Sequence, residues 1–397
     1  MFPKFGSQNS LILCCFRRAL AFFAGLPVLA FGITDLSSEL ERTSQEFGLP
    51  ALAAVVVKRG NVVAEGIAGN RRLGANIPAT LDDRFHIGSS SKAMIAFLAA
   101  KLVDQGKLRW ELTMEEAFPE LRDKIPGPLR AATLRQMFSH SSGLPGDNEE
   151  LLGLYFGAHK AMLPLPEQRM GVIERALSLP VAGAPGEKFA YSNLGYIVAG
   201  AMIERAAGRS WEELMHEMLF QPMGLTTAGI GPQASAGLVD APLPHFMENG
   251  EVLSIVGGPS SDIPAVMGSA GTVHMSPREF AKWASWNATM GKSQPDLLKT
   301  ETLRKLHTPQ IPTSRDLEEN TDGPEPGHYA LGWGVSGFPW TDKVFLQHRG
   351  SNGMNLALIV VLPEQELGLV LTTNIGGPKA NLAFEDLTKK LLQKFLD

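Results

Sequence analysis

Cysteine is nearly absent from this chain: of 397 residues only Cys14 and Cys15 are cysteines, and both stand near the N-terminus. The rest of the sequence therefore has no disulfide, no cysteine-ligated metal site and no thiol nucleophile. Gly-x-Ser-x-Gly and His-Glu-x-x-His are also missing, which disfavours a nucleophile-elbow hydrolase and a zinc metalloprotease. The net charge is −5 and no basic cluster occurs, so nucleic acid is not expected as a partner.

The N-terminal apolar run is shorter than a typical membrane span. It reads "ALAFFAGLPVLAFG", residues 19–32, and follows Arg17 and Arg18. A basic start, a short apolar run and small residues at its end predict a secretory signal peptide over residues 1–32, cut after Gly32. This favours a periplasmic or secreted protein. The alternatives are an N-terminal membrane anchor, an organelle transit peptide and a cytoplasmic protein.

Strand-like sequence stands near both ends of the remaining chain. "ALAAVVVKRGNVVAEGIAG", residues 51–69, predicts a hairpin that turns at Arg59-Gly60-Asn61. Near the C-terminus, "KVFLQH", "MNLALIVVL" and "LGLVLTTN" predict three strands, followed by a helix over residues 378–396. Residues 34–45 and 89–105 predict helices, the second apolar on most sides and therefore buried. "YALGWGV" predicts a glycine-rich strand near the site.

The middle of the chain, from about residue 110 to 295, is mainly helical in pattern. We therefore expect an α+β fold, an α/β sandwich in which an antiparallel sheet from both chain ends is flanked by helices. The expected division is a sheet lobe of residues 33–105 and 296–397, with a mostly helical lobe of residues 106–295 inserted. The polar segment 307–328 predicts an exposed loop.

A serine–lysine pair stands at the head of the buried helix, in "FHIGSSSKAMIAF", residues 85–97. In a helix, Ser89 shares a face with Lys92 three residues later, whereas Ser90 and Ser91 do not. A serine hydroxyl needs a neighbouring base to become a nucleophile, and a lysine whose pKa is lowered by burial can act as that base. The alternative is structural: Ser89 caps the helix and Lys92 is a solvated residue of its first turn.

Two further motifs follow "SSSK" at 89–92 along the chain: "YSN" at 191–193 and "HRG" at 348–350. The segments between them are "TLRQMFSHSSGLP" at 133–145, "FQPMGLTTAGIG" at 220–231 and "GSAGTVHMSPREFAKW" at 268–283. In these segments and in their order the sequence resembles the serine β-lactamase and penicillin-binding protein family, in its class C-like branch, which also holds D,D-peptidases, D-aminopeptidases and related esterases.

The resemblance implies a role for each matching residue. Ser89 is acylated, and Lys92 and Tyr191 share the acid and base work, with either of them as the base. A phenolate at Tyr191 would need a cation beside it. Asn193 binds the substrate's amide or ester side chain, and the backbone N–H groups of Ser89 and Ser351 form the oxyanion hole. No metal or organic cofactor is implied.

The third motif departs from the lactamase form, in which lysine is usual at the place of His348. A neutral imidazole can donate a hydrogen bond to a substrate but carries no charge for a carboxylate. Strand alternation turns Arg349 away from the His348 face. We expect Gly350 to leave room for a substrate lying along the strand. These features cast doubt on β-lactam turnover, but not on acyl-enzyme formation.

The sequence therefore predicts a serine hydrolase that acts on a β-lactam or on a D-amino-acid peptide amide. One alternative is a carboxylesterase of the β-lactamase-like type for short acyl esters. Another is a penicillin-binding sensor that is acylated slowly. The expected partner is a small-molecule or peptide substrate, with membrane association only through the N-terminus.

Overall fold

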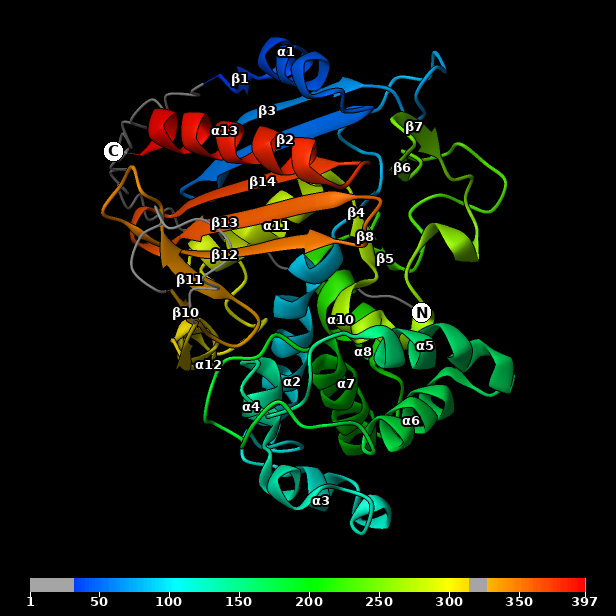
Figure 1. Cartoon of the computed structure of the whole chain (residues 1–397). Helices are drawn as coiled ribbons and strands as arrows, with labels where there is room; N and C mark the ends of the chain where they lie inside the picture. Colours follow the sequence, from blue (N-terminus) through cyan, green and yellow to red (C-terminus); the bar gives the residue numbers. More distant parts are fainter. Residues whose placement is uncertain (1–31, 314–326, 397) are drawn as a thin grey trace, which may run out of the picture. The chain divides into compact units, whose positions relative to one another are not determined.

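A nine-stranded sheet dominates the part of the chain that the computed structural model describes, residues 32–313 and 327–396 (Figure 1). Its strand order is β1-β3-β2-β14-β13-β12-β11-β10-β9, so strands from the two chain ends meet where β2 pairs with β14. All neighbouring strands run antiparallel except the short edge pair of β1 and β3. The expected α+β fold, with one sheet made from both ends, is confirmed.

The strands of this sheet are β1 Thr34–Asp35, β2 Ala51–Lys58, β3 Asn61–Gly69, β9 Ile311–Pro312, β10 His328–Tyr329, β11 Gly334–Gly337, β12 Val344–Ser351, β13 Leu356–Leu362 and β14 Leu367–Thr373. Smaller sheets hold β4 Phe85–His86, β5 Gly229–Ile230, β6 His245–Glu248, β7 Glu251–Ser254 and β8 Val273–Met275. The helices are α1 Ser37–Phe47, α2 Lys92–Asp104, α3 Met114–Ala117, α4 Leu134–Phe138, α5 Glu149–Gly157, α6 Leu165–Ala176, α7 Asn193–Ala207, α8 Trp211–Met215, α9 Gln221–Met223, α10 Gly268–Gly271, α11 Pro277–Ala288, α12 Thr300–His307 and α13 Pro378–Phe395.

Both faces of the sheet are covered by helices, which explains its continuous apolar strands. In β13, alternate residues Leu356, Leu358 and Val360 pack on one face with α1 and α13, while Ala357 and Ile359 pack on the other. That second face is covered by α11, which contacts β2, β13 and β14. A helix from within residues 106–295 thus packs directly on the sheet, and the two-lobe boundaries stay a prediction.

Helix α2 lies at the centre of the larger core, as its apolar sequence indicated. Ten of its residues are buried, and Phe97 packs edge-on against Trp283 and Trp286 of α11. Helix α7 contacts α2, and the last turn of α7 ends at Gly208 in a left-handed conformation. Helix α2 is therefore enclosed by α7 and α11, and the turn that precedes it, Gly88–Ser91, contacts β12 and β13.

Several predicted elements can be compared with the structure. The hairpin turns at Arg59 and Gly60, both with positive φ, which is the geometry of a tight two-residue turn. "YALGWGV" forms two antiparallel strands, β10 and β11, rather than the single predicted strand, because the chain turns at Gly332. Residues 1–31 of the predicted signal peptide and 314–326 of the predicted loop lie outside the described residues.

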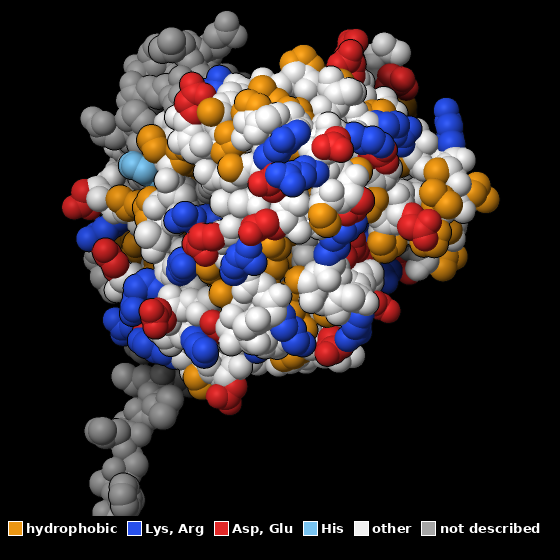
Figure 2. Space-filling model, turned by 90° about the horizontal axis from the view of Figure 1, so that it is seen from below, with side chains coloured by type: hydrophobic (Ala, Val, Ile, Leu, Met, Phe, Trp, Pro, Cys, Tyr) orange, Lys and Arg blue, Asp and Glu red, His pale blue; other side chains and the backbone are white. Residues whose placement is uncertain are grey.

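Acidic and basic side chains are mixed on the surface that faces the viewer in Figure 2. None of the helices within residues 32–313 and 327–396 combines the length and apolarity required to cross a membrane.

Candidate active site

Ser89 lies in a 3-10 turn, Gly88–Ser91, here called the serine turn, which connects β4 to α2. The sequence predicted that the helix already begins at residue 89, but the α-helix begins at Lys92. In a 3-10 turn, side chains three residues apart eclipse each other. Lys92 therefore stacks over Ser89, with its Nζ 2.9 Å from Ser89 Oγ. No side-chain cap is formed at the start of α2, so Ser89 is not the helix cap of the structural alternative.

Lys92 is completely buried, and its amine has three neighbours at hydrogen-bond distance. Besides Ser89 Oγ, these are the carbonyl oxygen of Ala270 at 2.6 Å and Asn193 Oδ1 at 2.8 Å. Burial lowers the pKa of this amine to about 7, and the charge of Asp147 opposes the shift. A large share of Lys92 is consequently neutral at neutral pH, as a general base must be.

Tyr191 precedes α7, whose first turn is capped by Ser192 through its Oγ and the N–H of Gly195, 3.1 Å apart. Lys92 Nζ lies 5.0 Å from the centroid of the Tyr191 ring, and the pKa of the phenol is influenced by the nearby Ser89 side chain. The residue is 38% exposed, so water reaches part of the ring. Burial of its phenol nevertheless raises the pKa of Tyr191 above its ordinary value. The phenol is thus held protonated, not as the phenolate considered from the sequence.

The ring of His140 packs against the ring of Tyr191. The two rings lie 4.1 Å apart between centroids and are tilted by 34°. His140 Nδ1 accepts a hydrogen bond from the N–H of Ser192 at 3.1 Å, and the His140 backbone has a positive φ of 54°. This histidine, part of the matching segment at 133–145, thus packs against the Tyr191 ring and binds the backbone of the next residue.

Asp147 is a site residue that the sequence did not single out. Its Oδ2 accepts a hydrogen bond of 2.7 Å from Asn193 Nδ2, and Asn193 Oδ1 accepts from Lys92. Because a carboxylate can only accept, this contact also fixes the orientation of the Asn193 amide. The loop sequence "GLPGDNEE" contains three acids and no motif distinguishes the first, so only the fold identifies Asp147.

The third motif occupies β12, beside the serine turn. His348 accepts a hydrogen bond of 2.8 Å at Nε2 from the Tyr329 hydroxyl and donates from Nδ1 to the carbonyl oxygen of Arg349. Both ring nitrogens are thus engaged within the chain, and the expected hydrogen bond from His348 to a substrate stays a prediction. Burial lowers the pKa of His348 to about 3, so the ring is neutral. Arg349 faces away, toward Asn381 of α13, as expected.

Gly350 lets the serine turn approach β12 closely. A methyl group on Gly350 would lie 1.9 Å from the carbonyl oxygen of Ile87 and 2.8 Å from the backbone nitrogen of Ser89. A methyl group on Gly88 would lie 2.4 Å from the backbone nitrogen of Ser351. The close approach of the backbone therefore requires glycine at position 350, and the expected room for a substrate there stays a prediction. The two nitrogens expected to form the oxyanion hole lie at this junction.

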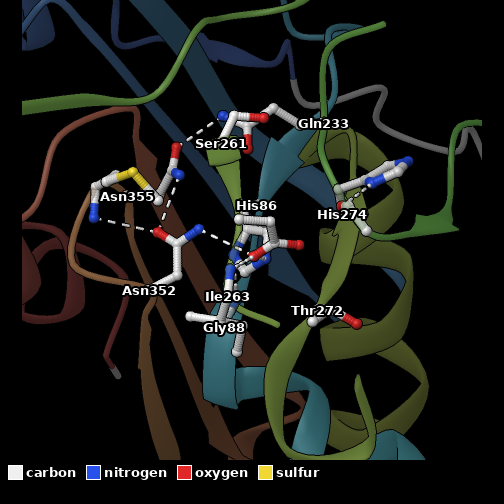
Figure 3. Close-up of polar contacts among 12 residues, drawn as sticks. His86, Gly88, Gln233, Ser261, Ile263, Thr272, His274, Asn352 and Asn355 are labelled. Carbon is white, nitrogen blue, oxygen red and sulfur yellow. Dashed lines mark hydrogen bonds and ion pairs between the residues drawn. The ribbon is translucent and has the colours of Figure 1, made fainter. Parts of the chain in front are cut away.

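A buried network of polar side chains connects the two sides of the junction between the serine turn and β12 (Figure 3). His86 is completely buried, and its Nδ1 accepts a hydrogen bond of 3.1 Å from the N–H of Gly88. Its Nε2 lies 2.9 Å from Asp262 Oδ1, which also accepts from Asn352 Nδ2 at 3.2 Å. The network therefore connects the residue before Ser89 with the residue after Ser351.

Comparison with known proteins places this site in a family. Protein Flp of Staphylococcus aureus strain MRSA252 is 21% identical over 364 residues, covering 90% of this chain and 66% of that protein. The chain thus spans slightly less than two thirds of that relative. The octameric penicillin-binding protein homologue from Pyrococcus abyssi has a TM-score of 0.72 at 23% identity, covering 89% of this chain and 76% of that one. The D-stereospecific amidohydrolase from Streptomyces has a TM-score of 0.67 at 21% identity, covering 87% and 96%.

These likenesses to solved structures establish a shared fold. The family assignment comes from the beta-lactamase family model, which matches residues 37–393. That range contains the serine turn, Tyr191 and the third motif. The chain belongs to the beta-lactamase family of serine hydrolases.

Proposed function

We propose that this protein hydrolyses amide bonds of D-amino-acid or peptide substrates through an acyl-enzyme on Ser89. The observation that carries the proposal is the 2.9 Å contact between Ser89 Oγ and Lys92 Nζ, together with the lowered pKa of that lysine. A nucleophile beside a base that is neutral at the working pH is the arrangement that covalent catalysis needs.

The contacts of Lys92 support it as the base. A neutral amine has two N–H groups and one lone pair. The Ala270 carbonyl and Asn193 Oδ1 are acceptors, so they take the two N–H groups. The lone pair is then left for the Ser89 hydroxyl, whose proton moves to Lys92 as Ser89 Oγ bonds to the substrate carbonyl carbon. The backbone N–H groups of Ser89 and Ser351 stabilise the oxyanion that forms.

Tyr191 serves as the acid in this proposal. Its phenol is protonated, and it donates its proton to the leaving nitrogen as the carbon–nitrogen bond breaks. The Lys92 ammonium, 5.0 Å from the ring centroid, returns a proton to the phenolate. Water then attacks the acyl-enzyme, giving the carboxylic acid and restoring the Ser89 hydroxyl. An amine leaving group needs this protonation more than an alcohol does, which favours amides over esters.

The third motif argues against β-lactams as the main substrates. These compounds carry a carboxylate, yet His348 is neutral with both ring nitrogens engaged. Arg349 contacts Asn381 on the far side of the strand. The D-stereospecific amidohydrolase that shares the fold supports an amide of a D-amino acid as the first substrate to test.

The pH dependence of acylation follows from the pKa of Lys92. With a pKa of about 7, the amine loses its proton as pH rises, so kcat/KM should increase tenfold per pH unit below 7 and level off above it, until the substrate's own α-amino group loses its proton near pH 8. The measurement is kcat/KM for a D-alanine p-nitroanilide between pH 5 and 9. A rate that falls as pH rises through 7 would show that the ammonium form of Lys92 is the active one.

A labelling experiment tests the acyl-enzyme directly. A fluorophosphonate probe should modify the wild-type protein at Ser89, located by mass spectrometry of peptides, and should not modify Ser89→Ala.

A comparison of substrates tests the substrate class. D-alanine p-nitroanilide should be hydrolysed faster than p-nitrophenyl butyrate or a chromogenic cephalosporin, each relative to its uncatalysed rate. Preferred cleavage of the butyrate would indicate the esterase, and a long-lived penicillin adduct without turnover would indicate the sensor.

A further inference from the structure

An exposed carboxylate lies beside the proposed catalytic groups and has no role in the proposed proton transfers. Asp147 is held by Asn193, whose Nδ2 donates to Asp147 Oδ2 at 2.7 Å and whose Oδ1 accepts from Lys92 at 2.8 Å. The side-chain amide of Asn193 therefore bridges the Asp147 carboxylate and the Lys92 amine. The other carboxylate oxygen, Oδ1, faces the Tyr155 hydroxyl at 3.5 Å.

The Asp147 carboxylate has acceptor sites that its contacts in the described residues leave unused. In the described part of the chain it forms no ion pair, and its close contacts are the neutral amide of Asn193 and the phenol of Tyr155. A carboxylate offers about four acceptor sites on its two oxygens, so sites remain for a ligand. Burial of the Tyr155 hydroxyl raises its pKa and keeps that phenol neutral, so it does not neutralise Asp147 either.

The local charge balance decides which ligands this carboxylate favours. Lys92 is the cation that Asn193 connects to Asp147, and it must be neutral to accept the Ser89 proton. His348 is neutral and Arg349 faces α13. In the reactive form, none of these three described residues compensates the negative charge of Asp147. A substrate carboxylate is repelled by such a site, whereas an ammonium group is attracted.

We propose that Asp147 binds the free α-ammonium group of the substrate, so that the enzyme acts on amides of amino acids or peptides whose N-terminus is unblocked. This inference rests on the proposed amide hydrolysis and narrows its substrate class. The α-nitrogen is about 2.5 Å from the scissile carbonyl carbon, which must reach Ser89 Oγ. Hydrogen bonds through Lys92 and Asn193 connect Ser89 with Asp147, so the carboxylate lies on the Asn193 side of the nucleophile.

Matched substrates test the inference. For the wild type, kcat/KM should be higher for D-alanine p-nitroanilide than for its N-acetyl derivative, in which the charge is removed. Asp147→Asn should lower that preference about 10- to 100-fold, as expected for the loss of a charge-assisted hydrogen bond. The control is Glu150→Gln, which removes a nearby exposed charge on α5 and should leave the preference unchanged. A wild type that prefers the acetylated anilide would overturn the inference.

A binding measurement separates this inference from the proposed function. In the Ser89→Ala background, where no acylation occurs, D-phenylalaninamide should bind more tightly than N-acetyl-D-phenylalaninamide by calorimetry. Adding Asp147→Asn should remove the difference. Equal binding of the two amides refutes ammonium recognition even if Ser89 is acylated normally. A clear preference in binding with no labelling of Ser89 supports the ammonium site and refutes the acyl-enzyme proposal.

Discussion

Replacing Lys92 by methionine should lower the second-order rate of Ser89 acylation by about 10²- to 10⁴-fold, the range typical for loss of a positioned general base. Methionine has a similar length and is apolar, so it suits a fully buried position but offers no lone pair basic enough to take the Ser89 proton. The residual rate should also lose the rise through pH 7 that the lysine confers. The measurement is the rate of labelling by a fluorophosphonate between pH 5 and 9.

The same substitution should stabilise the protein at low pH. An unfolded lysine keeps its proton up to about pH 10.5, whereas Lys92 releases it near 7 in the folded protein. Between these values the unfolded state binds more protons, so the wild type gains up to about 1.4 kcal/mol of unfolding free energy per pH unit as pH rises. Below pH 7 the full cost of burying the ammonium is present. Lys92→Met should therefore be most stabilising near pH 6, and its advantage should shrink toward pH 9.

Urea unfolding at pH 6, 7.5 and 9 measures this second effect. Lys107→Met is the control, because Lys107 is exposed just beyond α2 and should change neither acylation nor the pH dependence of stability. If Lys92→Met acylates at the wild-type rate, Lys92 is not the base. If its stability advantage does not depend on pH, the pKa of Lys92 is not lowered.

The sheet and its helices could be predicted because burial leaves a simple pattern. β13 and β14 are buried on both faces, so "LALIVVL" and "LGLVLTT" are continuous apolar runs. The amphipathic helix α13 covers one of these faces, and its apolar stripe includes Leu387 and Leu391. The position of α11 on the other face could not be predicted, because an apolar helix face does not specify the surface it covers.

The parts of the site that depend on residues close together in the sequence could be predicted. The parts that depend on hydrogen bonds between residues far apart in the sequence could be predicted less well. Ser89 and Lys92 are three residues apart, so any helical turn brings them together. Asp147 meets Lys92 only through Asn193, and Tyr329 occupies Nε2 of His348 from a separate strand. These long-range hydrogen bonds have no counterpart in local sequence, so the charge and polarity of the site emerged only from the fold.

Replacing Gly350 by alanine should reduce kcat/KM at least about 10²-fold although it removes no polar side chain of the site. The added methyl group would lie 1.9 Å from the Ile87 carbonyl oxygen and 2.7 Å from the Ser90 nitrogen, so the serine turn must move away from β12. The N–H groups of Ser89 and Ser351 would then no longer point at one oxyanion. Displacements of about 1 Å, or the loss of one oxyanion donor, have effects of this size.

The comparison variant is Gly153→Ala in α5, where an added methyl group meets no atom within 4 Å and alanine favours the helix. Kinetic constants and thermal melting should be measured for both. If Gly350→Ala does not fold, Ser90→Ala gives a milder test, because Ser90 Oγ donates a 2.9 Å hydrogen bond to the His348 carbonyl and holds the turn on the strand. Its kcat should fall while it remains folded. Wild-type kcat in either folded variant would mean that close docking of the serine turn on β12 does not position the reacting groups.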